Sequence, residues 1–181
     1  MHVKNSVYSA IRSVSWPPDA DKFTIYPQSG KKRGEGNGVT PIKANAIAYL
    51  IGNGWVANCP WPVGNLRNPG RIDAGFVSSR GLVGFEWETG NISSSHRSLN
   101  KLCLGLLRGE TIAGFLVVPS SSLAAYLTDR IGNISELEPY FDLWRSTPCE
   151  EGTLEIVVIE QDAVSLDVPR IPKGTDGRSL G

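Results

Sequence analysis

Three acidic residues on a short and otherwise apolar stretch are the residues of this chain best suited to chemistry. Asp73 lies in one apolar segment, and Glu86 and Glu88 lie in the next, within residues 71–91 (RIDAGFVSSRGLVGFEWETGN). Acidic side chains are depleted in β-strands, and buried ones are rare unless they are paired or bind a metal. The pattern therefore indicates a site for a divalent cation, which would activate water and stabilise a phosphodiester under attack.

The geometry of the hairpin that these two segments predict decides whether the acids meet. Alternation along the second strand places Glu86 and Glu88 on the same face. With a two-residue loop at 79–80, or with a four-residue loop, Asp73 lies directly opposite Glu86, with Cβ atoms about 4.5–5.5 Å apart. A three-residue loop ending in Gly81 would place the two acids on different faces unless a β-bulge restored them.

Each acid has a role that its position favours. We expect Asp73 and Glu86 to be metal ligands, together with the backbone carbonyl of Trp87, and Glu88 to orient or deprotonate the attacking water. The same acids on a half-exposed strand could be solvated and without chemistry. A glycoside-hydrolase carboxylate pair is a further alternative, but three crowded acids suit a cation better than a sugar ring. No Ser or Cys nucleophile has a recognisable set of partners.

Composition excludes several classes of protein. The chain has 181 residues, 40% of them apolar and 20% charged, which is ordinary for a globular protein of one domain. Lys plus Arg equals Asp plus Glu, at 18 each, so binding of nucleic acid would depend on a local basic face. The apolar runs are too short to span a bilayer, and the N-terminus lacks the pattern of a secretion signal. Three widely spaced cysteines and two histidines argue against a disulfide framework and a zinc site.

Predicted helices and strands around the hairpin must position the acids. Helical periodicity predicts a helix that begins with Thr40 as its N-cap and ends at Gly52 or Gly54. It also predicts a helix over residues 93–108, capped by one of its first serines, and a continuous apolar run predicts a buried strand at 112–118. This order of strand, helix and strand favours a crossover unit with parallel strands.

Weaker patterns predict the remaining elements: a largely irregular start (1–29) with a short extended segment (23–27), a proline-rich loop (59–70), one or two helices (120–145) and a last strand (154–159). From Pro169 onward the sequence is polar and rich in Gly and Pro, which predicts a flexible tail over residues 169–181. We therefore expect a single domain over residues 1–168, with its core at about 40–160.

Local basic groups are candidates for contacts to phosphate. The glycine-rich stretch at 30–39 contains Lys31, Lys32 and Arg33, and it is either a solvated loop or a loop that orders on phosphate. It lacks the sequence of a nucleotide-cradling loop. The first turns of the helix predicted over residues 93–108 combine a positive dipole with Arg97 and other polar groups.

The order of acids and elements resembles the core of the PD-(D/E)XK nucleases. Asp73, a short turn, a strand that ends in Glu86-Trp87-Glu88, a helix and another apolar strand follow one another in this chain. The same order is similar to that of type II restriction endonucleases of the BamHI and BglII kind, in which an acid or amide replaces the usual lysine. The tracts FEWETGNISSSHRSLNKL and LTDRIGNISELEPYFDLW add to the resemblance, which covers about residues 40–160.

The resemblance implies an α/β fold with a central mixed sheet flanked by helices. It implies a cytoplasmic homodimer, encoded by a bacterium or a phage, that cleaves double-stranded DNA at a short palindrome with Mg²⁺, for which Mn²⁺ can substitute. By motif position, Asp73 and Glu86 would be metal ligands and Glu88 would take the place of the lysine. The residues expected to contact DNA are Lys31, Lys32, Arg33, His96, Arg97, Asn100 and Lys101.

Two alternatives remain beside this interpretation. One is a non-catalytic DNA-binding or dimerisation module that has kept the fold. The other is a repair or phage nuclease of the same superfamily.

Overall fold

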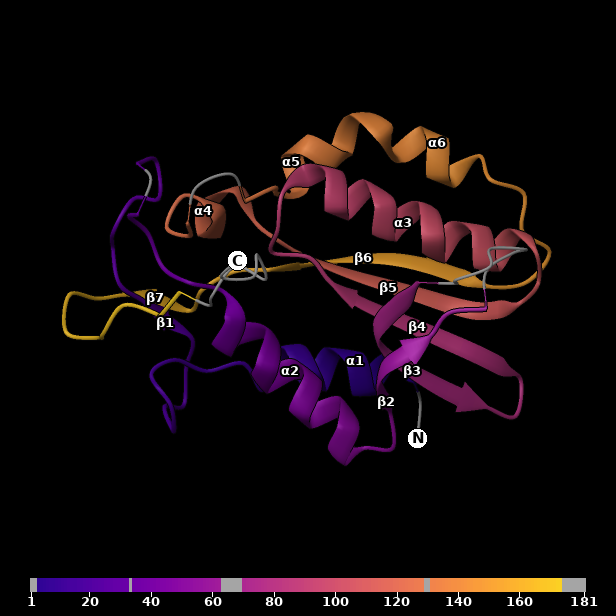
Figure 1. The fold of residues 1–181 in the computed structure, drawn as a ribbon, viewed down its shortest axis with the longest axis horizontal. Helices are drawn as coiled ribbons and strands as arrows, with labels where there is room; N and C mark the ends of the chain where they lie inside the picture. The colour runs from indigo at the N-terminus through magenta and orange to yellow at the C-terminus, as the bar shows by residue number, and fades with distance from the viewer. Residues whose placement is uncertain (1–2, 33, 63–69, 129–130, 174–181) are drawn as a thin grey trace, which may run out of the picture.

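The computed structural model describes residues 3–32, 34–62, 70–128 and 131–173. A mixed β-sheet lies at the centre of the protein (Figure 1). Its strand order is β2–β3–β4–β5–β6, with antiparallel pairing from β2 to β4 and parallel pairing from β4 to β6. The strands are β2 (Val56–Pro60), β3 (Arg71–Ser78), β4 (Gly81–Trp87), β5 (Thr111–Pro119) and β6 (Thr153–Ile159). The predicted mixed central sheet is confirmed.

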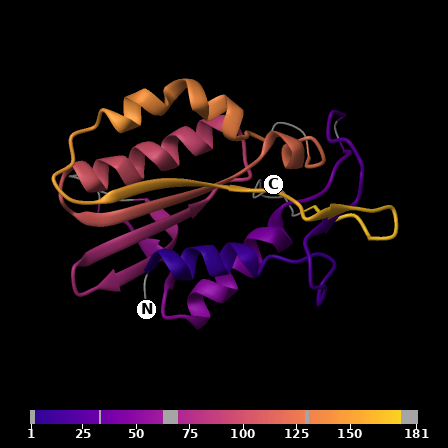
Figure 2. The ribbon, with the colours of Figure 1, turned by 180° about the vertical axis from the view of Figure 1, so that it is seen from behind.

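Helices cover both faces of this sheet (Figure 1). The helices α1 (Val3–Arg12) and α2 (Thr40–Gly52) cross each other beneath one face, as the reverse view in Figure 2 shows. The helix α3 (Ile92–Leu107) lies on the opposite face, and the shorter segments α5 (Ile134–Leu137), η1 (Glu138–Tyr140) and α6 (Phe141–Arg145) lie outside it. The predicted flanking helices are therefore confirmed.

The buried apolar side chains form two clusters, one for each face of the sheet. The cluster under α1 and α2 includes Leu50, Phe85 and Trp87. The cluster under α3 includes Trp61 and Leu102. Because β4 contributes to both clusters, both of its faces are covered, which is typical of a strand with a parallel neighbour.

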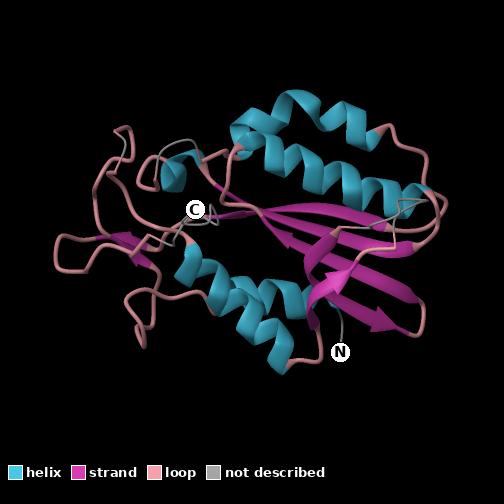
Figure 3. Ribbon diagram, viewed as in Figure 1, coloured by secondary structure: helices cyan, strands magenta, loops and turns pink. Residues whose placement is uncertain are grey.

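Several long connections lie at the end of the molecule that carries α4 (Ser121–Ala124) and β1 (Thr24–Ile25) (Figure 1). The helix α3 joins β4 to the parallel strand β5, so the predicted crossover unit is confirmed. The short helix α4 follows β5, and β1 pairs with β7 (Ala163–Val164) in a separate two-stranded sheet. Loops gather at this end, beyond the carboxyl ends of β5 and β6 (Figure 3). Among the described residues, no helix is both long enough and apolar enough to cross a membrane.

The prediction of an irregular N-terminus is wrong, because α1 occupies much of it. Val7, Ala10 and Val14 follow one another at helical spacing and are buried, but the stripe is short and its members are small. Such a stripe gains its stability from the α2 surface on which it packs. The short extended segment predicted in this region is present as β1.

Several predicted boundaries are shifted. The strand β2 extends through Cys59 and Pro60 into the predicted loop at 59–70, and a proline is tolerated there because β2 is an edge strand. Residues 63–69 of that loop lie outside the described residues. The N-cap of α2 is Val39, one residue before the predicted Thr40, and the N-cap of α3 is Asn91, whose side chain accepts from the Ser94 N–H.

Two predictions for the C-terminal third need correction. Residues 120–145 form the three short helices α4, α5 and α6 with the 3₁₀ turn η1, where one or two helices were expected. The predicted flexible tail does not begin at Pro169, because the carbonyl of Pro169 accepts a hydrogen bond from Trp16 Nε1 and Ile171 is 1% exposed. Residues 174–181 lie outside the described residues.

Gly84 sets the distance between β4 and α3. A Cβ atom at this position would lie 2.5 Å from Trp61 Cη2 and 2.8 Å from Leu102 Cδ2, closer than real Cβ contacts. The absence of a side chain therefore lets α3 approach the strand that carries Glu86 two residues later.

We predict that Gly84→Ala lowers the free energy of unfolding by about 1–3 kcal/mol, the usual cost of overpacking a core. The matched control is Gly52→Ala, because a Cβ atom at Gly52 meets nothing within 4 Å. That substitution should leave stability unchanged or raise it by up to about 1 kcal/mol. Chemical denaturation of both variants measures the difference, and equal effects would contradict the role assigned to Gly84.

Candidate active site

The β3–β4 hairpin brings two of the three acids together. Pairing begins with Ser78 and Gly81, so the connecting loop has two residues. The register is constant along the hairpin as far as its last pair, Ala74 and Phe85. Asp73 and Glu86 would form the next pair in the same register. The loop of even length, on which the predicted juxtaposition depends, is therefore present.

At Asp73 and Glu86, the two strands are linked by hydrogen bonds from backbone N–H groups to carboxylate side chains. The N–H of Asp73 donates to Glu86 Oε2 (3.2 Å), and the N–H of Trp87 donates to Asp73 Oδ2 (2.8 Å). Each strand thus offers an amide hydrogen to a carboxylate of its neighbour. Because the N–H and C=O of one residue in an antiparallel pair point to the same neighbouring strand, the Trp87 carbonyl also faces β3.

The edge strand β2 is irregular at the same level. Asn58 has a φ of 48°, which is uncommon for a residue other than glycine but tolerated by asparagine. Its paired neighbours are Ala57 with Ala74 and Cys59 with Ile72, so Asn58 lies level with Asp73. Regular pairing is therefore interrupted on both sides of Asp73.

Two helices supply a lysine to each acid. Lys43 of α2 forms an ion pair with Asp73 Oδ1 (2.6 Å). Lys101 of α3 forms an ion pair with Glu86 Oε1 and also donates to the carbonyl of Arg71 (2.9 Å). Since α2 and α3 lie on opposite faces of the sheet, the acid pair receives one counter-charge from each helical layer (Figure 1).

Burial makes Glu86 an unusual carboxylate. Its side chain is 6% exposed, and this burial raises its pKa above the usual range for glutamate. The ion pair with Lys101 opposes the increase in pKa, and the charge of Asp73 adds to it. The cation in contact with Glu86 therefore stabilises a charged form that burial disfavours.

Glu88 lies on the same face as Glu86 but has a different partner. Its Oε1 accepts a hydrogen bond from Ser98 Oγ of α3 (2.6 Å). Contacts to α3 by both Glu86 and Glu88 agree with the predicted alternation. Among the described residues, no group of three or more His, Cys, Asp or Glu side chains gathers to hold a metal ion, so Glu88 does not join the Asp73–Glu86 pair.

Residues predicted to bind DNA occupy different environments. Lys101 is part of the acid site, and Arg97 is exposed on α3. The ring of His96 contacts that of Tyr140 in an edge-to-face arrangement (centroids 4.7 Å apart), and Asn100 Oδ1 accepts from Trp144 Nε1 (2.9 Å).

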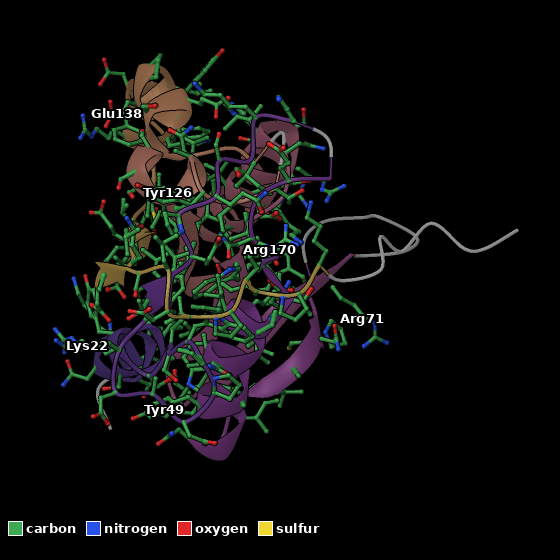
Figure 4. The ribbon with its side chains drawn as sticks, turned by 90° about the vertical axis from the view of Figure 1, so that its left-hand side faces the viewer. Lys22, Tyr49, Arg71, Tyr126, Glu138 and Arg170 are labelled. Carbon is green, nitrogen blue, oxygen red and sulfur yellow. The ribbon has the colours of Figure 1, made fainter. Side chains whose placement is uncertain are left out.

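The remaining predicted DNA contacts lie in the basic loop. Lys31 and Lys32 are exposed there, and Arg33 lies outside the described residues. Figure 4 looks onto this end of the molecule and shows Arg71 projecting from its side, at the start of β3.

Sequence reasoning missed Lys43, Ser98 and the part that Lys101 plays. The sequence contained a weak indication that Lys43 has a partner outside its own helix. A lysine near a helix N-terminus is disfavoured by the helix dipole, and the first turn of α2 has no acid that could compensate. Ser98 lies on the apolar stripe of α3 and is buried, which is unusual for serine.

The donor set fits a divalent cation. Asp73 and Glu86 provide oxygen atoms, which are the ligands that Mg²⁺ and Mn²⁺ prefer. Both carboxylates already bind a cationic group, in the form of the Lys43 and Lys101 ammonium groups. The site therefore has the negative charge and the oxygen atoms that a metal would need.

The mixed sheet between helices, with an acid facing Glu86-Trp87-Glu88 across a hairpin, defines a restriction-endonuclease-like α/β protein. A family model described as "Restriction endonuclease BamHI" matches residues 1–178. The chain therefore belongs to the BamHI family of restriction endonucleases, and the resemblance stated from the sequence is confirmed.

Two relatives cover almost the whole chain. The type II restriction enzyme OkrAI of Oceanobacter kriegii is 43% identical over 178 residues, which are 98% of this chain and 89% of that enzyme. The type II restriction enzyme BamHI of Bacillus amyloliquefaciens is 40% identical over 182 residues, covering 97% of this chain and 81% of that enzyme.

The raised pKa of Glu86 predicts a specific pH dependence of stability. Below about pH 4.3, the usual value for glutamate, the group is protonated in both the folded and the unfolded protein. As pH rises toward the raised pKa, the unfolded protein loses this proton first, so the wild type loses stability relative to Glu86→Gln.

Urea unfolding of the wild type and Glu86→Gln, from below about pH 4.3 upward and with a chelator present to remove metals, measures the difference in their stability. The free energy of unfolding of the wild type minus that of the variant should fall as pH rises. A difference that increases with pH would mean that Lys101 outweighs burial and lowers the pKa of Glu86.

Proposed function

We propose that the protein is a type II restriction endonuclease that hydrolyses phosphodiester bonds of double-stranded DNA at a short specific sequence. The observation that carries the proposal is the Asp73–Glu86 pair, in which two carboxylates share one position of the hairpin and both attract a cation. Membership of the BamHI family supplies the substrate class.

Mg²⁺ is the proposed cofactor, with Mn²⁺ as a substitute. Asp73, Glu86 and the Trp87 carbonyl are the residues that would hold it. When bound, such a cation lowers the pKa of a coordinated water and stabilises the developing charge on phosphoryl oxygens. The acid pair contributes the fixed negative charge that concentrates a divalent cation at the scissile phosphate.

Glu88 is the proposed group that orients or deprotonates the attacking water. Its Oε1 accepts from Ser98, and this contact fixes the direction of the carboxylate. Because Ser98 is buried in α3, the orientation of Glu88 is tied to the helix packing over the sheet. A general base must lie within hydrogen-bond reach of the proton that it removes, so fixed orientation favours this role.

DNA contacts are proposed for the basic groups at two places. Arg97, in the N-terminal half of α3, is exposed, and the dipole of this helix favours phosphate near its N-terminus. Lys31 and Lys32 are exposed on the glycine-rich loop. Contacts from His96, Asn100 and Lys101 remain part of the proposal, although these side chains also serve internal contacts.

A homodimer is proposed because a palindromic DNA site has two-fold symmetry, which a two-fold symmetric protein matches. The chain has a mass of 19.6 kDa. Sedimentation equilibrium of the full chain should therefore give about twice this mass. A single-chain mass at micromolar concentration, with and without DNA, would contradict the proposed dimer.

Cleavage of DNA of high sequence complexity tests the proposed activity directly. Wild type with Mg²⁺ should produce discrete fragments whose sequenced ends share one short site. Glu86→Ala should reduce the cleavage rate by at least about 100-fold, because metal assistance contributes several kcal/mol to the barrier and each 1.36 kcal/mol is tenfold in rate.

Glu155→Gln is the matched control, because Glu155 is a partly buried carboxylate that pairs with a lysine outside the site. It should cut at the wild-type rate at temperatures where it is folded. Equal results for wild type and Glu86→Ala would refute the catalytic proposal. DNA binding without cleavage by the wild type would instead favour the non-catalytic module.

A further inference from the structure

Every carboxylate oxygen of the acid pair already has a partner. One oxygen of each acid accepts from a backbone N–H, of Trp87 for Asp73 and of Asp73 for Glu86. The other oxygen of each acid contacts a lysine. Each carboxylate oxygen has a second lone pair, so it can keep its N–H donor while it binds a metal ion. A metal ion that approaches the oxygens in contact with the lysines, however, meets an ammonium group.

The backbone partners are the harder ones to displace. The N–H groups of Asp73 and Trp87 belong to β3 and β4, and loss of their hydrogen bonds to the carboxylates would leave two strand donors unsatisfied, at a cost comparable to a lost hydrogen bond. A lysine side chain, in contrast, can turn its ammonium group to water while its stem stays in place. Competition therefore falls on the lysines.

Lys43 and Lys101 differ in how firmly they are held. The Lys101 side chain is 22% exposed and has a second acceptor in the Arg71 carbonyl. The Lys43 side chain is 39% exposed, and among the described residues its ammonium group contacts Asp73 alone. Lys43 is thus the cation that can leave with the smaller loss of contacts.

We propose that Lys43 is a displaceable counter-cation, which neutralises Asp73 in the metal-free protein and leaves the carboxylate when a divalent cation is bound. This inference rests on the proposed metal-dependent function. In the metal-free protein, Lys43 offsets the repulsion between two acids that face each other across the hairpin. The contact between Lys43 and Asp73 lowers the affinity for metal, because the free energy of breaking this contact is subtracted from the free energy of metal binding.

Substitution of Lys43 separates these two effects. Lys43→Met keeps the aliphatic stem of the side chain and removes its charge. Without metal, the variant should unfold at lower denaturant concentration than the wild type. In saturating Mg²⁺ the two proteins should be equally stable, and calorimetric titration with Mg²⁺ in the absence of DNA should give about three- to tenfold tighter binding to the variant.

Lys4 offers a closely matched control. It pairs with Glu155 at 2.9 Å, with side-chain exposures of 47% and 18%, while Lys43 pairs with Asp73 at 2.6 Å with exposures of 39% and 19%. Lys4→Met should lose the same stability with and without Mg²⁺, and its Mg²⁺ affinity should equal that of the wild type. Lys43→Gln, which retains a hydrogen-bond donor, serves in the same comparison if Lys43→Met does not fold.

The outcomes distinguish this inference from the proposed function. If the wild type binds Mg²⁺ and Lys43→Met binds it equally or more weakly, with a stability deficit that persists in Mg²⁺, then Lys43 is a fixed structural partner and the inference fails alone. If the wild type shows no Mg²⁺ binding or stabilisation, both the proposed cofactor and the inference fail. Tighter binding by the variant, with a deficit confined to the metal-free state, supports the inference.

Discussion

The architecture of the site depends on one replacement in the β3–β4 hairpin, where two carboxylates take over from backbone carbonyls as acceptors. Regular pairing ends at Ala74 and Phe85, and beyond it the N–H groups of Asp73 and Trp87 are satisfied by acidic side chains. The two carboxylates therefore hold the strands together, in addition to any part in catalysis. Because each is held by the other strand, their mutual position is fixed by the hairpin itself.

This arrangement concentrates negative charge in a place with little water, and the rest of the fold compensates for it. Burial disfavours the charged form of Glu86, and the charge of Asp73 adds to that effect. The helical layers on the two faces each contribute a lysine, so Asp73 and Glu86 each have one ammonium group in contact. The close approach of α3 to β4 over Gly84 brings Ser98 and Lys101 within reach of Glu88 and Glu86.

The same features would keep a nuclease of the proposed kind stable before it binds a metal. Lysine ammonium groups satisfy the carboxylates in the metal-free protein, and they are attached by flexible stems that can move aside. An acid pair without such partners would repel itself and weaken the hairpin. On this view, Lys43 adjusts metal affinity as well as stability.

Local rules predicted the hairpin and its acids because the relevant constraints lie within a short span of sequence. Strand alternation and loop length alone decide whether Asp73 faces Glu86, and the two-residue loop fulfils the condition. The crossover through α3 follows from the strand, helix and strand order.

The lysines could not be predicted in the same way. Lys43 lies 30 residues before Asp73 in the chain, and its contact exists only because α2 packs beneath the sheet. The packing of α1 and the anchoring of Ile171 also arise from contacts between distant segments, which no local pattern encodes.

Anomalous diffraction from crystals of the full protein soaked in Mn²⁺ tests the central claim most directly. The account predicts a peak within coordination distance of Asp73 and Glu86, with the Lys43 ammonium group moved away from Asp73. A Mn²⁺ peak that avoids these two carboxylates, with both lysine ion pairs intact, would contradict it.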